Sequence, residues 1–192
     1  MSPARFRAAA LPILVAGLLL GASCGPKSLA ARAVPFPAEK PVFTDAEGKP
    51  LKSLPPCVEP VRLVLIDAPW CPPCDDARKA IREASASFPK GMVRVYRVLV
   101  DRERFLAKEG PREVPPLEPT REFRLGEIPV TTLTALPGPF REQFRLEQFP
   151  VLLLMDPGGA IAGRWTGFSP GMAGALAGAV SRLSTSLRRP GT

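Results

Sequence analysis

Residues 61–88 decide the fold, and they read VRLVLIDAPWCPPCDDARKAIREASASF. Residues 61–66 are aliphatic apart from one arginine, which is typical of a buried β-strand. Apolar residues then recur at helical spacing over residues 74–88, which predicts a helix with one buried face. Two cysteines, Cys71 and Cys74, stand where the strand ends and the helix begins. The stretch therefore predicts a strand–turn–helix unit with a cysteine pair at the turn.

The cysteine pair has Cys-x-x-Cys spacing, within the motif Trp-Cys-Pro-Pro-Cys at residues 70–74. Two intervening residues let one helical turn bring the sulfurs close enough to bond, the arrangement used for reversible dithiol chemistry. The positive end of the helix dipole favours a thiolate at the first cysteine. We expect Cys71 to be the catalytic nucleophile that attacks a substrate disulfide. Cys74, one turn into the helix, would then resolve the mixed disulfide.

The composition excludes several other kinds of site. The 192 residues include no histidine, which removes Ser-His and Cys-His catalytic pairs and every zinc site that uses imidazole. A cysteine zinc site would need a second pair. The chain has four cysteines, of which Cys24 lies in the leader, so that Cys57 is left alone. We therefore expect no metal site and no cofactor.

The residues outside this unit continue an alternation of strands and helices. Residues 156–159 (DPGG) form a strong hairpin turn, and Gly48 supplies the positive φ of an N-terminal hairpin. Residues 169–187 predict a last helix that starts at Ser-Pro and has an apolar stripe. The further predicted strands cover residues 42–44, 51–54, 92–100, 151–155 and 160–165. Together these elements imply an α/β sandwich with a mixed central sheet flanked by helices.

The first 24 residues predict an export signal. Arg5 and Arg7 precede thirteen uncharged residues, 8–20. This is short of the roughly 20 residues that span a membrane, and it is typical of a secretory leader. Residues 21–24 (GASC) resemble a bacterial lipobox, which would make Cys24 the lipidated first residue of the mature chain. The alternatives are ordinary cleavage nearby, with Cys24 lost or left as a plain thiol, and an uncleaved membrane anchor.

A tether and a single domain follow the leader. Residues 25–41 hold four prolines and no apolar periodicity, which predicts a stiff tether before a domain of residues 42–192. The formal charge is +8. Basic and acidic residues are nevertheless interspersed, whereas a nucleic-acid site would cluster the basic ones. We therefore expect a solvated surface that favours anionic lipid, and no nucleic-acid partner.

The chain resembles the thioredoxin superfamily, and specifically its TlpA-like, membrane-tethered thiol–disulfide oxidoreductases. Besides the cysteine motif, residues 43–51 (FTDAEGKPL) are similar to their N-terminal hairpin, and residues 148–154 (QFPVLLL) to their cis-proline loop and following strand. Residues 156–159 (DPGG) and 164–167 (RWTG) are similar to their hairpin and closing glycine. The resemblance covers about residues 42–187 and implies a thioredoxin-like fold.

The resemblance also implies a substrate-binding loop. Pro150 would be cis and lie against the two cysteines, and the backbone of Phe149 would pair with a substrate peptide. Trp70 completes the expected substrate-binding residues. Pro129 is a competing candidate for the cis-proline, because residues 127–131 read EIPVT. An ordinary proline at the start of a strand is the alternative for position 150.

A long insertion is predicted at about residues 102–138. Residues 128–135 resemble the extra central strand of the TlpA-like group, and residues 102–127 make a proline-containing excursion. Loops of this length are usually functional or mobile. The excursion either shapes the choice of partner or is a neutral surface insertion.

Asp67 is a candidate proton relay to Cys74. Plain thioredoxin has a buried Asp where this chain has Leu65. Asp67 lies two residues further along the predicted strand, so that it projects to the same face. The alternative is a solvated Asp at the end of a strand.

The start of the helix carries groups that oppose a thiolate at Cys71. Asp75 and Asp76 place two negative charges there, and Pro72 and Pro73 remove two N–H donors. We therefore expect a potential nearer the thioredoxin value of about −270 mV than the strong-oxidant value of about −120 mV. This favours a reductant.

Cys57 precedes the strand that leads to the motif. Because a strand rises about 3.3 Å per residue, Cys57 should lie near the opposite end of the sheet, where it cannot easily resolve Cys71. It is either a partly buried spare thiol or a site of pairing with another chain.

The sequence thus predicts a thiol–disulfide oxidoreductase of the bacterial cell envelope that faces the periplasm and acts as a reductant. The expected partners are protein thiols and disulfides, an upstream electron-donor protein, and the membrane through a lipid on Cys24. The resemblance suggests apocytochrome c thiols as the substrate. The rival interpretation is a redox-silent lipoprotein of the same fold that binds a partner. A peroxidase is a weaker third option, because no peroxide-binding Pro, Thr and Cys signature surrounds Cys57 or Cys71.

Overall fold

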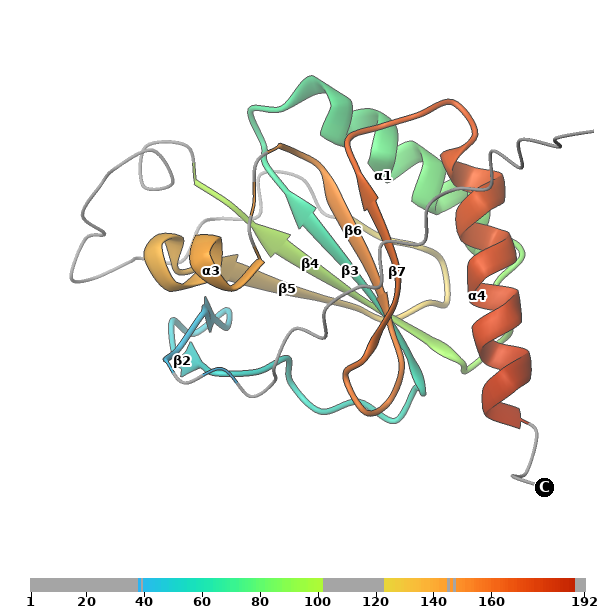
Figure 1. The fold of residues 1–192 in the computed structure, drawn as a ribbon, viewed down its shortest axis with the longest axis horizontal. Coiled ribbons are helices and arrows are strands. Elements are labelled where there is room, and N and C mark those ends of the chain that lie inside the picture. Colours follow the sequence, from blue (N-terminus) through green and yellow to red (C-terminus); the bar gives the residue numbers. More distant parts are fainter. Residues whose placement is uncertain (1–37, 39, 102–122, 145, 147, 189–192) are drawn as a thin grey trace, which may run out of the picture.

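The computed structural model describes residues 38, 40–101, 123–144, 146 and 148–188. Within these residues, seven strands form one sheet in the order β2-β1-β5-β4-β3-β6-β7 (Figure 1). The strands are β1 (Phe43–Thr44), β2 (Pro50–Leu51), β3 (Val61–Asp67), β4 (Val93–Leu99), β5 (Val130–Ala135), β6 (Val151–Met155) and β7 (Ile161–Thr166). The helices are α1 (Pro72–Ser85), α3 (Pro137–Phe144) and α4 (Met172–Arg188).

The sheet is mixed, with a parallel centre. Strands β3, β4 and β5 run parallel, and each strand further out is antiparallel to its inner neighbour. Strand β3 is central, and its Leu65 lies opposite both Arg97 of β4 and Leu152 of β6. The three parallel strands end at the same edge of the sheet, and this is the edge at which β3 leads into α1.

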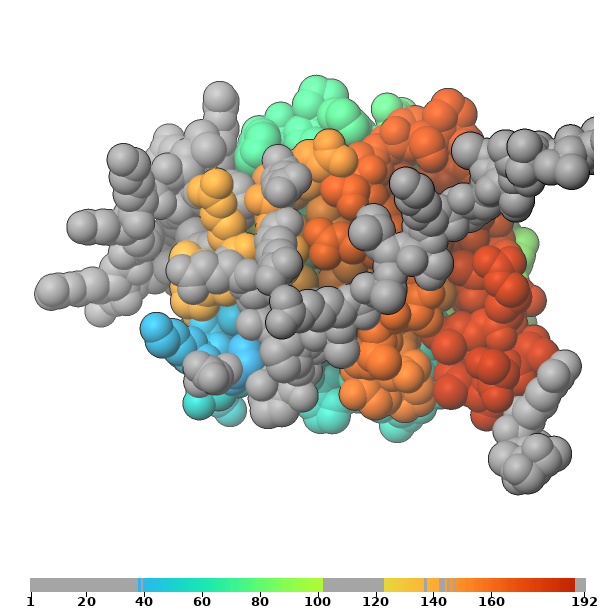
Figure 2. Space-filling view, in the orientation of Figure 1, coloured from blue at the N-terminus to red at the C-terminus, as the bar shows by residue number. Residues whose placement is uncertain are grey.

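Helices cover both faces of the sheet. Leu63 and Leu65 of β3 pack with α1 and α4 on one face, whereas Val64 and Ile66 pack with α3 on the other. Both faces of β3 are buried, which is why the strand is apolar at almost every position instead of alternating. Figure 1 shows α1 and α4 side by side, with α3 next to the β1–β2 hairpin. In the space-filling view of Figure 2, the β6–β7 hairpin and α4 form a continuous surface.

The fold class predicted from the sequence is confirmed, and most element boundaries shift by only one or two residues. Strand β6 coincides with the predicted residues 151–155. The last helix begins at Met172, three residues after the predicted cap at Ser169, and Leu187 is 39% exposed instead of completing the buried stripe.

Helix α3 is an element that the sequence did not predict. It begins at Pro137 and continues through Gly138 and a second proline, a start that lowers helix propensity. Proline is nevertheless tolerated in the first turn of a helix. Phe140 and Phe144 are one turn apart and both buried, and their rings lie 4.5 Å apart between centres. Both contact the ring of Phe43, so packing of the aromatic residues stabilises a helix that propensity disfavours.

Several sequence-based expectations lie outside the described residues. These are the signal at residues 1–24, nearly all of the tether at 25–41, and residues 102–122 of the insertion. In the part of the chain that the structure describes, no helix is long and apolar enough to cross a membrane.

Candidate active site

The cysteine pair lies at the junction between β3 and α1, as the sequence predicts. The strand ends at Asp67, and Cys71 is the N-cap of the helix that begins at Pro72. The N–H of Cys71 donates to the carbonyl of Ala68 at 3.0 Å, and the N–H of Cys74 donates to the carbonyl of Cys71 at 3.0 Å. These two hydrogen bonds turn the chain and start the helix, so they fix both cysteines near its N-terminus.

The N-terminus of α1 has few N–H groups to offer a thiolate. Pro72 and Pro73 occupy its first positions and carry no N–H. The N–H of Cys74, the next residue, is already bonded to the carbonyl of Cys71. The helix dipole remains, but the hydrogen bonds that usually accompany it are missing from the first three residues.

The two thiols differ in accessibility. Both are free, and Cys71 keeps 8% of its surface exposed whereas Cys74 is fully buried. Burial, and secondarily the hydrogen bond with Cys71, raise the pKa of Cys74 well above its ordinary value. Cys74 therefore retains its proton in the dithiol. This suits a residue that reacts only after Cys71 has bonded to a substrate.

The loop before β6 lies against the cysteines. The Phe149–Pro150 peptide bond is cis, and Pro150 is buried. The side chain of Phe149 packs on the small cluster formed by Ala68, Cys71 and Cys74. The carbonyl of Pro150 accepts a hydrogen bond from the N–H of Gly167 at 2.8 Å, which joins the loop to the end of β7. The cis peptide predicted at position 150, in preference to Pro129, is confirmed.

Trp70 stands over the same loop. Its ring meets that of Phe149 edge to face, with 5.6 Å between the ring centres and an interplanar angle of 82°. Trp70 is 41% exposed, a high value for a large aromatic side chain. The structure thus brings Trp70, Phe149 and Pro150 together beside the cysteine pair, and their role in binding substrate stays a prediction.

Asp67 lies at the end of β3 with its side chain fully buried. It accepts hydrogen bonds from Arg78 Nη1 at 2.5 Å and from Arg97 Nε at 2.6 Å. Arg97 is also buried, and its guanidinium carbon lies 5.9 Å from the centre of the Phe123 ring. The alternative of a solvated Asp at the strand end is therefore wrong. The proposed proton relay from Asp67 to Cys74 stays a prediction.

The two acids at the start of α1 are paired with cations from the same helix. Arg78 donates to Asp75, and Lys79 donates to Asp76 at 3.1 Å, each three residues along the helix. The Arg78–Asp75 pair reduces the field that Asp75 exerts on Cys71, whereas the Lys79–Asp76 pair is solvent-exposed on both sides and contributes little. The negative charge of Asp75 is therefore partly compensated, and the effect of Asp75 and Asp76 on the redox potential stays a prediction.

Arg78 and Arg97 are the site residues that sequence reasoning missed. Arg97 interrupts a strand whose other inward-facing positions are apolar, and a charge buried in a sheet needs a partner of opposite charge. Arg78 follows Cys74 by four residues and so shares its face of α1. These two signals were present in the sequence, but neither identifies Asp67 as the shared partner.

Cys57 lies away from the pair, as predicted. It is partly buried before the start of β3, and its Sγ donates to the carbonyl of Glu59 at 3.3 Å. The site at Cys71 and Cys74 is at the other end of the same strand. Cys24 and the predicted lipid attachment fall outside the described residues.

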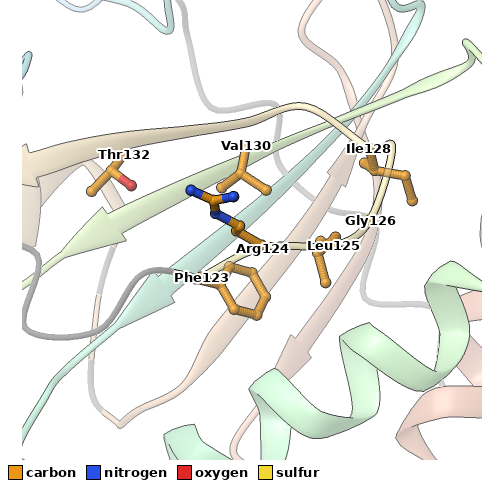
Figure 3. Close-up of a pocket in the computed structure, with 7 residues that line it drawn as sticks. All are labelled: Phe123, Arg124, Leu125, Gly126, Ile128, Val130 and Thr132. Carbon is orange, nitrogen blue, oxygen red and sulfur yellow. The ribbon is translucent and has the colours of Figure 1, made fainter.

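A pocket of about 330 Å³ lies beside β5 and is bounded by residues 123–126, Ile128, Val130 and Thr132 (Figure 3). Figure 3 shows the Arg124 side chain extending toward Val130. None of the predicted site residues lines this pocket. Among the described residues, no group of three or more cysteine and acidic side chains is placed to hold a metal ion.

Comparison with known proteins identifies the fold. No family model matches the sequence, and no curated protein matches it. A thioredoxin-like protein from Porphyromonas gingivalis is 19% identical with a TM-score of 0.55, over 79% of this chain and 94% of that one. The exposed lipoprotein thioredoxin of Streptococcus pneumoniae is 14% identical with a TM-score of 0.52, over 74% and 98% of the respective chains. The chain therefore has a thioredoxin-like fold, and its cysteine pair occupies the junction of the central strand and the first long helix.

Proposed function

We propose that the protein is a thiol–disulfide oxidoreductase that acts on protein substrates through Cys71 and Cys74. The observation that carries the proposal is the pair of free thiols at the N-terminus of α1, one partly accessible and one buried, with Phe149 and a cis-proline packed beside them. A structural cysteine pair would need neither this difference in exposure nor an exposed tryptophan beside it.

The reaction consists of two exchanges. The Cys71 thiolate attacks one sulfur of a substrate disulfide, and the other substrate sulfur leaves as a thiolate that takes up a proton. Cys74 then loses its proton and attacks Cys71 Sγ, which releases the second substrate thiol and forms the Cys71–Cys74 disulfide. Two electrons pass to the substrate. A donor dithiol protein must then reduce the new disulfide before the next turnover.

The compartment and the direction of electron flow belong to the same proposal. The basic leader, the uncharged run and the lipobox-like residues 21–24 support export and a lipid on Cys24, which would tether the domain to the bacterial envelope. One protein of the same fold is itself described as an exposed lipoprotein thioredoxin. The reductant direction is supported by the missing N–H donors of Pro72 and Pro73. With apocytochrome c or another oxidised protein as substrate, the same two exchanges apply.

The test is an equilibrium titration of the purified protein in a series of thiol–disulfide buffers, read by alkylation and mass. We expect one two-electron transition confined to Cys71 and Cys74, with a midpoint potential of about −270 mV. A midpoint potential of about −120 mV would make the protein an oxidant. If these two cysteines showed no transition at all, the redox function would be wrong and the binding-scaffold interpretation would take its place.

A further inference from the structure

The carboxylate of Asp67 is the most deeply buried charge near the cysteines. One oxygen accepts from Arg78 and the other from Arg97, at 2.5 and 2.6 Å. The side chain of Asp67 has no exposed surface, that of Arg97 has 3% and that of Arg78 has 14%. Charge-assisted hydrogen bonds of this length are strong, and removing one partner from a buried pair is costly. The three side chains therefore form a buried ionic cluster at the carboxyl end of β3, next to the cysteine motif.

Two of the three residues in this cluster are connected to the cysteines through the chain. The residue after Asp67 is Ala68, whose side chain packs on both cysteines. Arg78 follows Cys74 by one helical turn. Burial is the main cause of the raised pKa of Cys74, but the charge of Asp67 also contributes to it. The sulfur of Cys74 is therefore affected by the charge at this end of β3.

Arg78 differs from Arg97 because it binds two carboxylates. It donates to Asp67 on the strand and to Asp75, which is half exposed in the first turn of α1. Arg78 thus places one positive charge between a buried acid at the end of β3 and an acid in the first turn of α1. Without it, both carboxylates would act on the sulfurs with less compensation, and Asp67 would do so from a buried position where charge is poorly screened.

We propose that Arg78 is a positioning residue that sets the equilibrium between the dithiol and the disulfide by neutralising Asp67 and Asp75 beside the sulfurs. The inference rests on the proposed redox function. A thiolate at Cys71 stabilises the reduced form, and uncompensated carboxylates destabilise that thiolate. Arg78 therefore favours the dithiol, whereas Asp67 favours the disulfide.

The two ends of one ion pair should then shift the equilibrium in opposite directions. At a pH at which Cys71 is ionised, Arg78→Gln is expected to move the equilibrium constant against a reference dithiol about tenfold toward the disulfide, or about 30 mV to lower potential. Asp67→Asn is expected to move it by a similar factor toward the dithiol. Both variants lose the same hydrogen bond, so a role confined to stability would lower the Tm in both and leave the equilibrium constant unchanged.

Two further variants serve as controls for charge. Arg78→Lys keeps the positive charge and should restore most of the wild-type equilibrium. Lys79→Gln removes the neighbouring cation, which is 71% exposed and pairs with Asp76 in the same three-residue spacing. It should leave the equilibrium constant within twofold of the wild-type value.

A milder variant keeps the proposal testable if Arg78→Gln does not fold. Asp75→Asn removes the half-exposed acid and leaves the buried pair intact, and it should move the equilibrium two- to threefold toward the dithiol. Shifts in the same direction for Arg78→Gln and Asp67→Asn, or no shift in folded Asp75→Asn, would overturn the proposal. A wild-type protein without a Cys71–Cys74 transition would instead overturn the redox function itself.

Discussion

The two ends of strand β3 carry similar groups arranged for different purposes. Each end has a cysteine, a carboxylate and an arginine. At the carboxyl end, Asp67 is fully buried beside Cys71 and Cys74. At the amino end, Cys57 precedes the strand, and its neighbour Glu59 accepts two hydrogen bonds from Arg94, at 2.8 and 3.2 Å.

The polar groups at the amino end of β3 have a structural role. Arg94 also donates to Thr131 of β5, so it joins Glu59 to two neighbouring strands. The hydroxyl of Tyr96 donates to the carbonyl of Pro55 at 2.6 Å. Burial, and then a hydrogen bond with Cys57, raise the pKa of Tyr96. These contacts join the segment before β3 to β4 and β5.

The comparison shows what distinguishes the proposed redox site from the cysteine at the other end of the strand. A thiol next to a carboxylate and an arginine occurs at both ends of the strand. Only the carboxyl end has a second cysteine one turn away, a helix N-terminus and a cis-proline loop, within the described residues. We infer that the proposed redox site depends on the helix and the second thiol. In this proposal, the ion pair adjusts the site but does not create it.

Replacing each cysteine by serine gives the largest expected difference between the two ends. Cys71→Ser should lower the rate of protein disulfide reduction, with dithiothreitol as the electron source, by about 10³-fold or more, because the nucleophile is lost. Cys57→Ser should keep the rate within twofold of the wild type. Insulin precipitation measures both. A loss of activity in the Cys57 variant comparable to that in the Cys71 variant would break the comparison, since the amino end would then take part in the chemistry.

Truncating the exposed apolar side chain at each end should give a smaller difference, which is measured as the KM for a protein disulfide. Trp70 is 41% exposed beside Cys71, and Val58 is 92% exposed beside Cys57. Trp70→Ala should raise the KM for a protein disulfide about five- to tenfold, since truncating an aromatic anchor costs on the order of 1 kcal/mol or more. Val58→Ser should have no effect on it. The rate with a small disulfide should be nearly unchanged in both variants. An equal loss with the small disulfide would show that Trp70 acts on the cysteines instead of on the substrate protein.

Local patterns in the sequence predicted the geometry of the candidate site because its parts are local. The strand at residues 61–66, the helix after it and the two cysteines lie within one stretch, where periodicity and spacing decide the structure. Pro150 is distant in sequence, and its position came from a resemblance to a family. The structure confirms its cis peptide bond.

The groups that the sequence did not predict depend on contacts between distant segments. Arg97 meets Asp67 across thirty residues, through the parallel pairing of β3 and β4. That register cannot be read from either strand alone, because both strands are largely buried on both faces and show no simple alternation. Helix α3 has an unfavourable local helix propensity. It forms because Phe140 and Phe144 pack on Phe43, about a hundred residues earlier in the chain. Tertiary packing overrides propensity in this element.

The smallest expected effect concerns the stability that Glu59 contributes. The hydrogen bond from Arg94 holds the pKa of Glu59 below its usual value of 4.5. The folded state therefore favours the carboxylate more than the unfolded state does. The stabilisation is fully present above about pH 4.5 and is lost as the pH falls through the lower pKa of the folded state. Glu59→Gln should thus be less stable than the wild type at pH 7, by about 1 kcal/mol for a pair that is partly exposed.

Urea unfolding followed by circular dichroism at pH 7, 5, 4 and 3 measures this difference. The two unfolding curves should converge as the pH falls below about 4.5, because the wild-type carboxyl then becomes protonated and loses its advantage over the amide. Glu127→Gln is the matched control, since Glu127 pairs with Lys90 on the open surface, where both side chains are almost fully exposed. A deficit in Glu59→Gln that stays constant down to pH 3 would mean that the side chain stabilises the amino end by packing. The ion pair at that end would then differ from the one at Asp67 in kind as well as in strength.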